Sequence, residues 1–293
     1  MYASRFEYAA ASSWEEAVGL LAAGGDDAKV IAGGQSLVPL MTLRLATPRI
    51  LVDVNRASSE AIQQDDGHLL IPALTRHAEL QRSSLIRQWS PILAEAAGFI
   101  GNIRVRHRGT IGGTLAHADP AAELPTVVLA LQGSVRVLGP GGKREIPASE
   151  FLVSYFTTAL EPDEVVTAVR VPVIQYGRGW AFVELARRVG DFALVEAAAL
   201  VDLEDDGRCS AVRLALGAVG ERPFEASDLA SPMVGAEPAD DVVAEVGRAA
   251  SEAVEPSDGV HGSAEYRRQM VATVTKRALL AAARRAGRGA TAG

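Results

Sequence analysis

Short apolar stretches and helical patterns alternate over the first third of the chain. Residues 28–32 and 50–54 are mainly apolar and include β-branched side chains, which predicts two short strands. Between the chain start and the first of these, Ser13 followed by Glu16 is typical of a capping box at a helix start. Residues 36–45 predict a short helical or irregular segment. The order helix, strand, short helix, strand indicates a small α/β unit.

From about residue 69 the pattern changes to short apolar runs separated by turn signals. These runs are typical of strands and lie at residues 69–73, 127–131, 134–138 and 165–171. The segment 139–142, Gly-Pro-Gly-Gly, predicts a hairpin loop. One helix is expected to interrupt the strands, with Ser90 as its N-cap and Pro91 in its first turn.

The pattern of apolar residues in the last third of the chain predicts strands followed by helices. A domain boundary is expected between residues 172 and 179, and strands at 180–185, 194–203 and 211–219, with a turn at 205–207. Helical periodicity covers 239–254 and 264–286. In the second helix, a buried face is expected to carry Tyr266, Met270, Val274 and Leu279.

Two glycine pairs stand in near-matching contexts. Gly33-Gly34 follows an apolar run, Gly112-Gly113 follows Thr110-Ile111, and each pair has a hydroxyl within two residues. Adjacent glycines allow positive φ, so that successive N–H groups can point into one anion-binding concavity. A single pair would be an ordinary loop. Two such loops brought together are predicted to hold a pyrophosphate.

Composition narrows the class of protein. A chain of 293 residues, 48% hydrophobic and 22% charged, is typical of a globular protein of two domains. The net charge of −7 argues against a nucleic-acid partner. No apolar run is long enough to cross a bilayer, and the first residues contain no apolar signal-peptide core, so a cytoplasmic location is expected.

Cysteine and histidine usage argues against a metal site in this chain. Cys209 is the only cysteine, so an internal disulfide and a four-cysteine iron–sulfur site are both excluded. The five histidines show no HxxxH or HxH spacing. We therefore expect no metal ligands and name no catalytic acid or base.

The glycine pairs lie in runs that resemble a known family. Residues 32–36 (AGGQS) and 110–114 (TIGGT) resemble the two FAD-binding loops of the molybdenum hydroxylases. More narrowly, the chain is similar to the separate FAD subunit, or medium chain, of carbon monoxide, nicotine and related dehydrogenases. Gln35 stands where the carbon monoxide enzymes usually carry histidine, and Thr114 where the family often has asparagine. The similarity continues at 51–55, 117–125, 161–164, 217–220 and 266–268.

The resemblance implies an α+β, PCMH-type (vanillyl-alcohol-oxidase-like) FAD-binding fold. Two α/β subdomains, about 1–56 and 57–175, would precede a C-terminal domain, 176–287, with a three-stranded antiparallel sheet and helices; 288–293 would be a disordered tail. FAD would lie extended between the first two subdomains, with Glu123 near its ribityl or ring end. The implied cofactor-binding residues are Ala32, Gly33, Gly34, Gln35, Ser36, Leu37, Thr110, Ile111, Gly112, Gly113, Thr114, Glu123, Val166 and Leu194.

The resemblance also implies an electron relay. A large partner subunit would oxidise the substrate at a molybdenum cofactor, and a small partner with [2Fe–2S] clusters would pass electrons to FAD here, for delivery to an external acceptor. The expected assembly is a dimer of heterotrimers. Two alternatives stay open at this point: a self-sufficient FAD oxidase of the same fold, and a non-catalytic nucleotide-binding scaffold.

Two features near the second pair have alternative interpretations. Arg104, Arg106, His107 and Arg108 form a basic segment that would meet FAD phosphates or an acidic partner, or would simply be solvated. His117 would contact the flavin or serve as a hydrogen-bonded structural histidine, and we favour the structural role.

Overall fold

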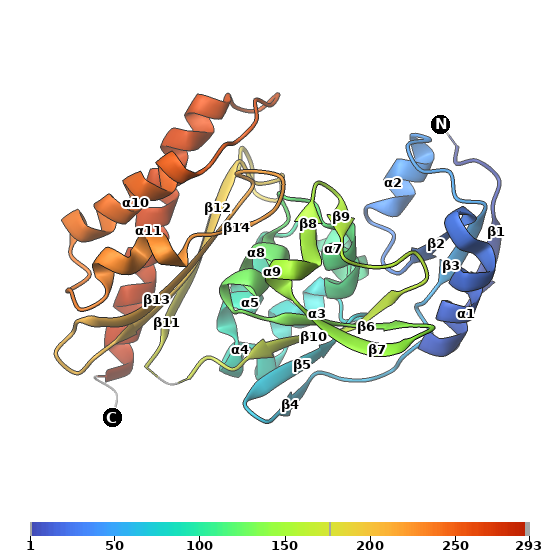
Figure 1. Cartoon of the computed structure of the whole chain (residues 1–293), viewed down its shortest axis with the longest axis horizontal. Helices are drawn as coiled ribbons and strands as arrows, with labels where there is room; N and C mark the ends of the chain where they lie inside the picture. Colours follow the sequence, from blue (N-terminus) through green and yellow to red (C-terminus); the bar gives the residue numbers. More distant parts are fainter. Residues whose placement is uncertain (1, 176, 291–293) are drawn as a thin grey trace.

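The computed structural model describes residues 2–175 and 177–290, and side chains as far as residue 287. The chain forms three sheet-based units in sequence order, and Figure 1 shows them side by side, with the N-terminal unit at one end and the C-terminal helices at the other. Each unit has a cluster of buried apolar side chains. No helix in these ranges combines the length and apolar character that crossing a membrane requires.

The N-terminal unit is a parallel three-stranded sheet with helices. The strands are ordered β1 (Glu7–Ala10), β3 (Ile50–Asp53), β2 (Ala28–Ile31). The remaining elements are α1 (Trp14–Gly24), η1 (Gly25–Asp27) and α2 (Leu37–Thr42). The Ser13 hydroxyl accepts the N–H of Glu16 (3.1 Å), as predicted, whereas the Glu16 carboxylate accepts from Ser12 instead of Ser13. The predicted order of helix, strand, short helix and strand is confirmed by α1, β2, α2 and β3, and the strand β1 that precedes them was not predicted.

The middle unit has an antiparallel sheet of five strands. Their order is β4 (Gln63–Asp65), β5 (His68–Pro72), β10 (Val165–Pro172), β6 (Ser134–Gly139), β7 (Gly142–Pro147). The hairpin predicted at 139–142 joins β6 and β7. The helices and a two-stranded ribbon are α3 (His77–Arg82), α4 (Ser84–Trp89), α5 (Pro91–Phe99), α6 (Ile103–Arg108), α7 (Ile111–His117), α8 (Glu123–Ala130), α9 (Ala148–Phe151), β8 (Leu152–Ser154) and β9 (Thr157–Thr158).

Three sequence predictions for the middle unit need correction. One helix was expected among its strands, whereas the described residues form seven there, α3 to α9. The apolar run 127–131 is not a strand, because it lies in and just beyond α8. All eight residues of this helix are buried, and a short, continuous apolar run in a buried helix cannot be told from a buried strand by periodicity. Ser90 does stand at the N-cap of α5, yet its hydroxyl makes no capping hydrogen bond.

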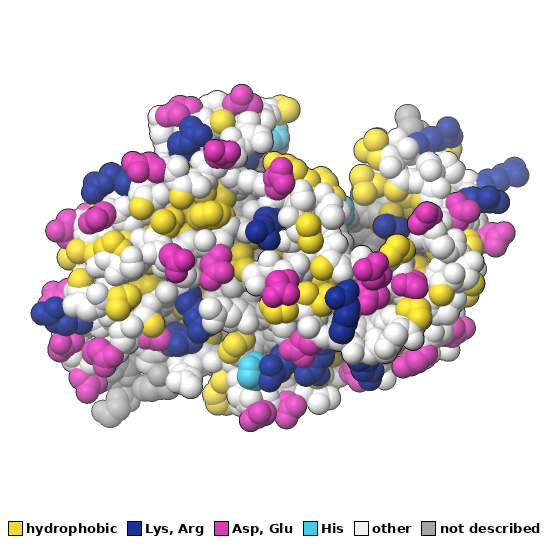
Figure 2. All heavy atoms as spheres, in the orientation of Figure 1, with side chains coloured by type: hydrophobic (Ala, Val, Ile, Leu, Met, Phe, Trp, Pro, Cys, Tyr) yellow, Lys and Arg dark blue, Asp and Glu magenta, His cyan; other side chains and the backbone are white. Residues whose placement is uncertain are grey.

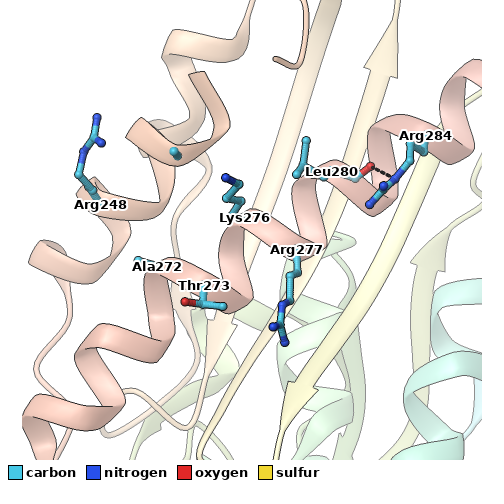
Figure 3. Close-up of a pocket in the computed structure, with 8 residues that line it drawn as sticks. Arg248, Ala272, Thr273, Lys276, Arg277, Leu280 and Arg284 are labelled. Atoms are coloured by element: carbon cyan, nitrogen blue, oxygen red, sulfur yellow. Dashed lines mark hydrogen bonds between the residues drawn. The ribbon is translucent and has the colours of Figure 1, made fainter. Parts of the chain in front are cut away.

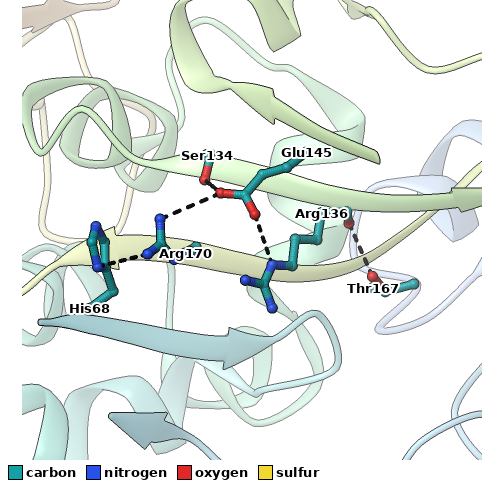
Figure 4. A network of polar contacts seen from close by, with 6 residues as sticks. All are labelled: His68, Ser134, Arg136, Glu145, Thr167 and Arg170. Carbon is teal, nitrogen blue, oxygen red and sulfur yellow. Dashed lines mark hydrogen bonds and ion pairs between the residues drawn. The ribbon is translucent and has the colours of Figure 1, made fainter. Parts of the chain in front are cut away.

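A polar network covers part of the five-stranded sheet (Figure 4). Glu145 on β7 accepts from Ser134 and from Arg136 (2.9 Å) on β6, and lies 3.7 Å from Arg170 on β10. Arg170 in turn contacts His68 on β5 (2.8 Å). These half-exposed cross-strand pairs link four neighbouring strands, which is a structural role for charges on a solvated sheet face.

The C-terminal unit is an antiparallel sheet covered by two helices. The strands run in order β11 (Gly179–Leu185), β12 (Val195–Leu203), β13 (Cys209–Gly217), β14 (Phe224–Glu225), and η2 (Ser227–Met233), α10 (Asp240–Ala253) and α11 (Ala264–Ala290) follow. The sheet therefore has four strands where three were expected, because the two-residue β14 adds to β13. Gly179 shows how closely α11 packs, since a Cβ there would overlap the carbonyl oxygen of Ala282.

The last helix differs from its prediction at both ends. Val274 and Leu279 are buried as expected, but Tyr266 is 41% exposed and Met270 is only half-buried. α11 is helical as far as Ala290, so the expected tail 288–293 is helical in its first three residues, and 291–293 lie outside the described residues.

β12 lies between two apolar cores. Ala197 and Ala199 belong to the core shared with α10 and α11, whereas Ala198 and Leu200 belong to the core of the middle unit. Alternate side chains of a strand point to opposite faces of its sheet. The C-terminal sheet therefore presents one face to its own helices and the other to the middle unit.

Candidate functional site

The two glycine pairs lie at a point of direct backbone contact. A Cβ at Gly33 would overlap the carbonyl oxygen of Arg108 and would lie 2.8 Å from the Cα of Gly109. A Cβ at Gly112 would lie 2.5 Å from the Cβ and 2.9 Å from the Cα of Ala73. Neither neighbour is a flexible side-chain end that could move aside. Both glycines are therefore required by close packing, and the two segments that the sequence singled out are brought together.

Positive φ is needed at only one of the four glycines. Gly34 has φ of +71°, the left-handed conformation that glycine adopts without strain. Gly33, Gly112 and Gly113 lack positive φ, and the second pair lies in the first turn of α7. The expectation of two alike glycine turns with positive φ is therefore wrong for the second segment, which is a helix start.

The two segments also differ in their free donors. In the second, Ile111 N–H donates to Thr75 O (3.1 Å), Gly112 to Ala73 O (2.9 Å), Gly113 to Thr110 Oγ1 (3.1 Å) and Thr114 to Thr110 O (3.0 Å). In the first, the N–H groups of residues 33–36 donate to no acceptor within the described part of the chain. The first loop thus offers consecutive N–H groups to a ligand, and the second forms a rigid wall beside it.

The side chains of the first loop leave its donors open. Gln35 and Ser36 are exposed. The Gln35 amide folds back and donates to the Gly33 carbonyl (3.1 Å). Ser36 stands at the N-cap of α2 without a side-chain capping bond, so its hydroxyl is available, and Leu37 begins the helix. Backbone amides and a hydroxyl in one exposed turn suit the oxygens of a phosphate.

A notch in the surface borders the glycine segments. Figure 2 shows the surface hollowed between the lobe that carries α2 and the middle of the molecule near α7 and the β8–β9 ribbon. Exposed apolar side chains occur on the segments at both sides: Val38, Leu43 and Leu45 on one, and Val153, Tyr155 and Phe156 on the other. Apolar walls with a few polar groups are typical of cofactor sites.

His77 braces the second segment from behind. Its backbone N–H donates to Gly109 O (3.1 Å), and its Nε2 lies 3.0 Å from Thr114 Oγ1. Burial lowers the pKa of His77 to about 4, so the ring is neutral at physiological pH. No local pattern pointed to His77, because its partners lie more than thirty positions away.

Glu123 lies in a cluster of carboxyl groups that sequence reasoning missed. It is the first residue of α8 and is 8% exposed. Besides burial, the charges of Glu184 on β11 and of Asp119 raise its pKa, and the charge of Glu123 in turn raises the pKa of Glu196 on β12. Glu196 is fully buried and accepts the Thr126 hydroxyl (2.6 Å). Burial raises the pKa of Glu123 to about 8, that of Glu184 to about 7, and that of Glu196 well above its usual value. The cluster therefore holds protons at neutral pH.

Two predicted residues remain, and one of them lies beside the second glycine segment. The strand that carries Val166, β10, packs against α7, and Thr167 O accepts the N–H of Ala73 (2.9 Å), the residue against which Gly112 packs. Val166 on β10 and Leu194 just before β12 are both buried, at 8% and 5% exposed. The groove between α10 and α11, at the opposite end of the molecule from α2, is lined by Arg248, Lys276, Arg277 and Arg284 (Figures 1 and 3). Across the described ranges, no group of three or more His, Cys, Asp or Glu side chains is placed to hold a metal ion.

Two family models account for nearly the whole chain. Residues 4–174 match the FAD-binding domain in molybdopterin dehydrogenase, and residues 180–282 match the CO dehydrogenase flavoprotein C-terminal domain. This chain belongs to the FAD-binding medium-subunit family of the molybdenum hydroxylases. The two relatives described next align over almost their full length.

Among those relatives is the 6-hydroxypseudooxynicotine dehydrogenase complex subunit alpha of Paenarthrobacter nicotinovorans, 45% identical over 96% of this chain and 95% of that protein. The carbon monoxide dehydrogenase medium chain of Hydrogenophaga pseudoflava is 37% identical over 96% and 98%. The solved carbon monoxide dehydrogenase of H. pseudoflava, in a form that lacks the Mo-pyranopterin moiety of the molybdenum cofactor, superposes with a TM-score of 0.94 over 97% of this chain and 99% of that one. The fold class implied by the resemblance is thereby confirmed.

Proposed function

We propose that this chain is the FAD-carrying electron-transfer subunit of a heterotrimeric molybdenum hydroxylase. Its substrate would be oxidised at a molybdenum cofactor in a large partner subunit, and [2Fe–2S] clusters in a small partner would deliver electrons to the flavin here. The observation that carries the proposal is the contact between Gly33 and Arg108. This contact supports the proposal because Gly33 packs against the residues just before the second glycine segment, beside a loop with free N–H groups, within the range that matches the FAD-binding domain.

Residues 32–37 would hold the pyrophosphate, because the N–H groups of residues 33–36 and the Ser36 hydroxyl are the free donors of this segment. Residues 110–114 would form the opposing wall, with exposed Gly113 letting the ligand approach the backbone closely. Glu123, Val166 and Leu194 are proposed as further contacts along the cofactor. FAD, when bound, supplies the electron-transfer chemistry, and this chain binds and orients it.

The proposed assignment of FAD to this chain and of the other cofactors to partner subunits follows from the cysteine content of the chain. Its one cysteine, Cys209, is buried and free, so the iron–sulfur clusters belong elsewhere. The relatives named above are a complex subunit and a medium chain, which are parts of larger assemblies. We propose the corresponding assembly for this chain, a dimer of heterotrimers in the cytoplasm, with domain limits at 1–175 and 176–287.

Reconstitution of the purified chain with FAD tests this function against its two alternatives. We expect flavin absorption bands that dithionite bleaches and that an artificial acceptor such as ferricyanide restores. A chain that shows no flavin bands after reconstitution would favour a nucleotide-binding scaffold. A chain that oxidises an organic compound by itself, with no partner present, would favour a self-sufficient oxidase.

A further inference from the structure

A chain of polar contacts runs from the N-terminal sheet to the second glycine segment. Tyr8 on β1 donates to the Asp53 carboxylate at the end of β3 (2.6 Å). Asp53 accepts the backbone N–H (2.8 Å) and the side-chain amide (2.7 Å) of Asn55. The contacts continue to Arg76 and from there to the carbonyl of Arg108. Five residues from four separate parts of the sequence are thus joined in one series.

Asn55 is the branch point of this series. Its side-chain nitrogen donates to Ala32 O (2.9 Å) as well as to Asp53, and its side-chain oxygen accepts from Arg76 Nη2 (2.6 Å). An asparagine is the residue that offers two donors and one acceptor on so short a side chain. Leucine, aspartate or alanine at this position would each lose at least one of these contacts. Asn55 therefore ties the start of the first glycine loop to Arg76.

Arg76 completes the connection to the second segment. Its Nη1 donates to the carbonyl oxygen of Arg108, and its backbone forms an isolated bridge with Thr110. That same Arg108 carbonyl is the group against which Gly33 packs. One guanidinium fork thus spans the Asn55 side chain and the backbone on which the first loop rests.

The environment of Arg76 argues for a specific use of its charge. Burial and the nearby Arg108 cation lower the pKa of Arg76, which means that the surroundings disfavour the charged form of its side chain. Within the described residues, Arg76 forms no ion pair with a carboxylate, and its two recorded side-chain acceptors are a neutral amide oxygen and a backbone carbonyl. Partial burial of a guanidinium costs free energy, which the hydrogen bonds to these two acceptors offset only while both acceptors stay in place.

We propose that Arg76 and Asn55 are positioning residues that fix the spacing of the two glycine segments and so set the affinity of the chain for FAD. Neither residue needs to touch the cofactor. The inference rests on the proposed FAD site at residues 32–37 and 110–114. It extends that site to two side chains that hold its halves in register.

The test compares FAD dissociation constants of the full-length apo-chain by flavin fluorescence, together with apo-protein melting temperatures and the visible spectrum of bound flavin. The test variants are Arg76→Ala, Asn55→Ala and the double variant. Gly33→Val tests the site itself, and Arg82→Ala is the control, because Arg82 is an exposed arginine in α3.

In Arg76→Ala, the loss of hydrogen bonds made by a charged group predicts that the FAD dissociation constant rises about ten- to one-hundred-fold. Arg82→Ala should bind as the unchanged chain does.

Two further readouts separate positioning from general stability. Asn55 and Arg76 are successive links in one connection from Ala32 to the Arg108 carbonyl, so that loss of either side chain breaks it. The double variant should therefore bind FAD about as weakly as the weaker single variant, instead of showing the product of the two losses. Added methylguanidinium should recover part of the affinity of Arg76→Ala and leave Asn55→Ala unchanged. A purely structural role would instead lower the apo-protein melting temperature with no such recovery.

The outcomes distinguish the inference from the proposed site. Unchanged FAD affinity in Arg76→Ala, with loss of FAD in Gly33→Val, would overturn the positioning role and leave the site in place. If the double variant loses FAD affinity by the product of the two single losses, Asn55 and Arg76 act independently, and the proposed coupling between them is overturned. Normal FAD binding by Gly33→Val would overturn the site itself.

Discussion

Glu184 on β11 and Glu196 on β12 lie directly opposite each other in the antiparallel pair. Side chains at opposed positions project to the same face of a sheet, and two ionised carboxylates there would repel. The face is the one that meets the middle unit, because Glu196 bonds to Thr126 of α8 and Glu123 of the same helix joins the cluster. Protonation is thus part of how the two units pack.

The cluster predicts that the chain loses stability as the pH rises. The folded-state pKa values are raised, to about 8 for Glu123 and about 7 for Glu184, so the folded chain binds more protons than the unfolded one above pH 4.5. Stability from these groups is full below that pH and is lost as the pH rises towards 8. Each carboxyl that keeps its proton contributes a slope of at most about 1.4 kcal/mol per pH unit. Urea unfolding between pH 5 and 8 measures this, and a free energy of unfolding that rises over that window would contradict it.

Replacing Glu196 with glutamine should remove part of that dependence. The glutamine amide would keep an oxygen for the Thr126 hydroxyl and would carry no charge to bury, so Glu196→Gln should be more stable than the unchanged chain at pH 8 and similar at pH 5. Glu145→Gln is the matched control. The Glu145 pKa is lowered by hydrogen bonds from Ser134 and Arg136, although burial opposes this, so its loss should destabilise at pH 8. Equal effects of the two variants at pH 8 would refute the carboxyl cluster.

Small substitutions at the glycines should have graded effects. Gly33→Ala and Gly112→Ala place a methyl group against backbone or a fixed Cβ, so both should weaken FAD retention strongly. Gly113→Ala meets only the Thr110 hydroxyl, at 2.8 Å, and should be milder. Gly141→Ala, where no atom lies within 4 Å, is the control and should retain FAD. The flavin-to-protein absorbance ratio after gel filtration checks the order, and equal retention by all four variants would contradict it.

The sequence located the glycine segments but not what each contributes. Gly33 and Gly112 have similar neighbours in the sequence. In the structure, Gly33 borders free N–H groups, whereas Gly112 lies in a helix whose N–H groups are already hydrogen-bonded. That difference depends on Ala73, Thr75 and Arg108, which a local pattern does not include.

The positions of Arg76 and of the three glutamates could not be predicted either, because their contacts join distant parts of the sequence. Arg76 is an isolated arginine whose partners lie 21 and 32 positions away, and Glu123, Glu184 and Glu196 come from three separate elements. α8 was mistaken for a strand because it is buried on every side. In contrast, α10 has one solvated face, and its predicted range of 239–254 agrees with the observed Asp240–Ala253 to within one residue at each end.

The proposal that this chain carries FAD within a molybdenum- and iron-containing complex is tested most directly by one purification. The chain, tagged in its native host, is isolated under mild conditions, and the eluate is analysed for FAD, iron, molybdenum and co-eluting polypeptides. We predict a large and a small partner, with FAD, iron and molybdenum in constant ratio to this chain across the elution peak. A chain that elutes alone, without iron, molybdenum or flavin, would contradict this prediction.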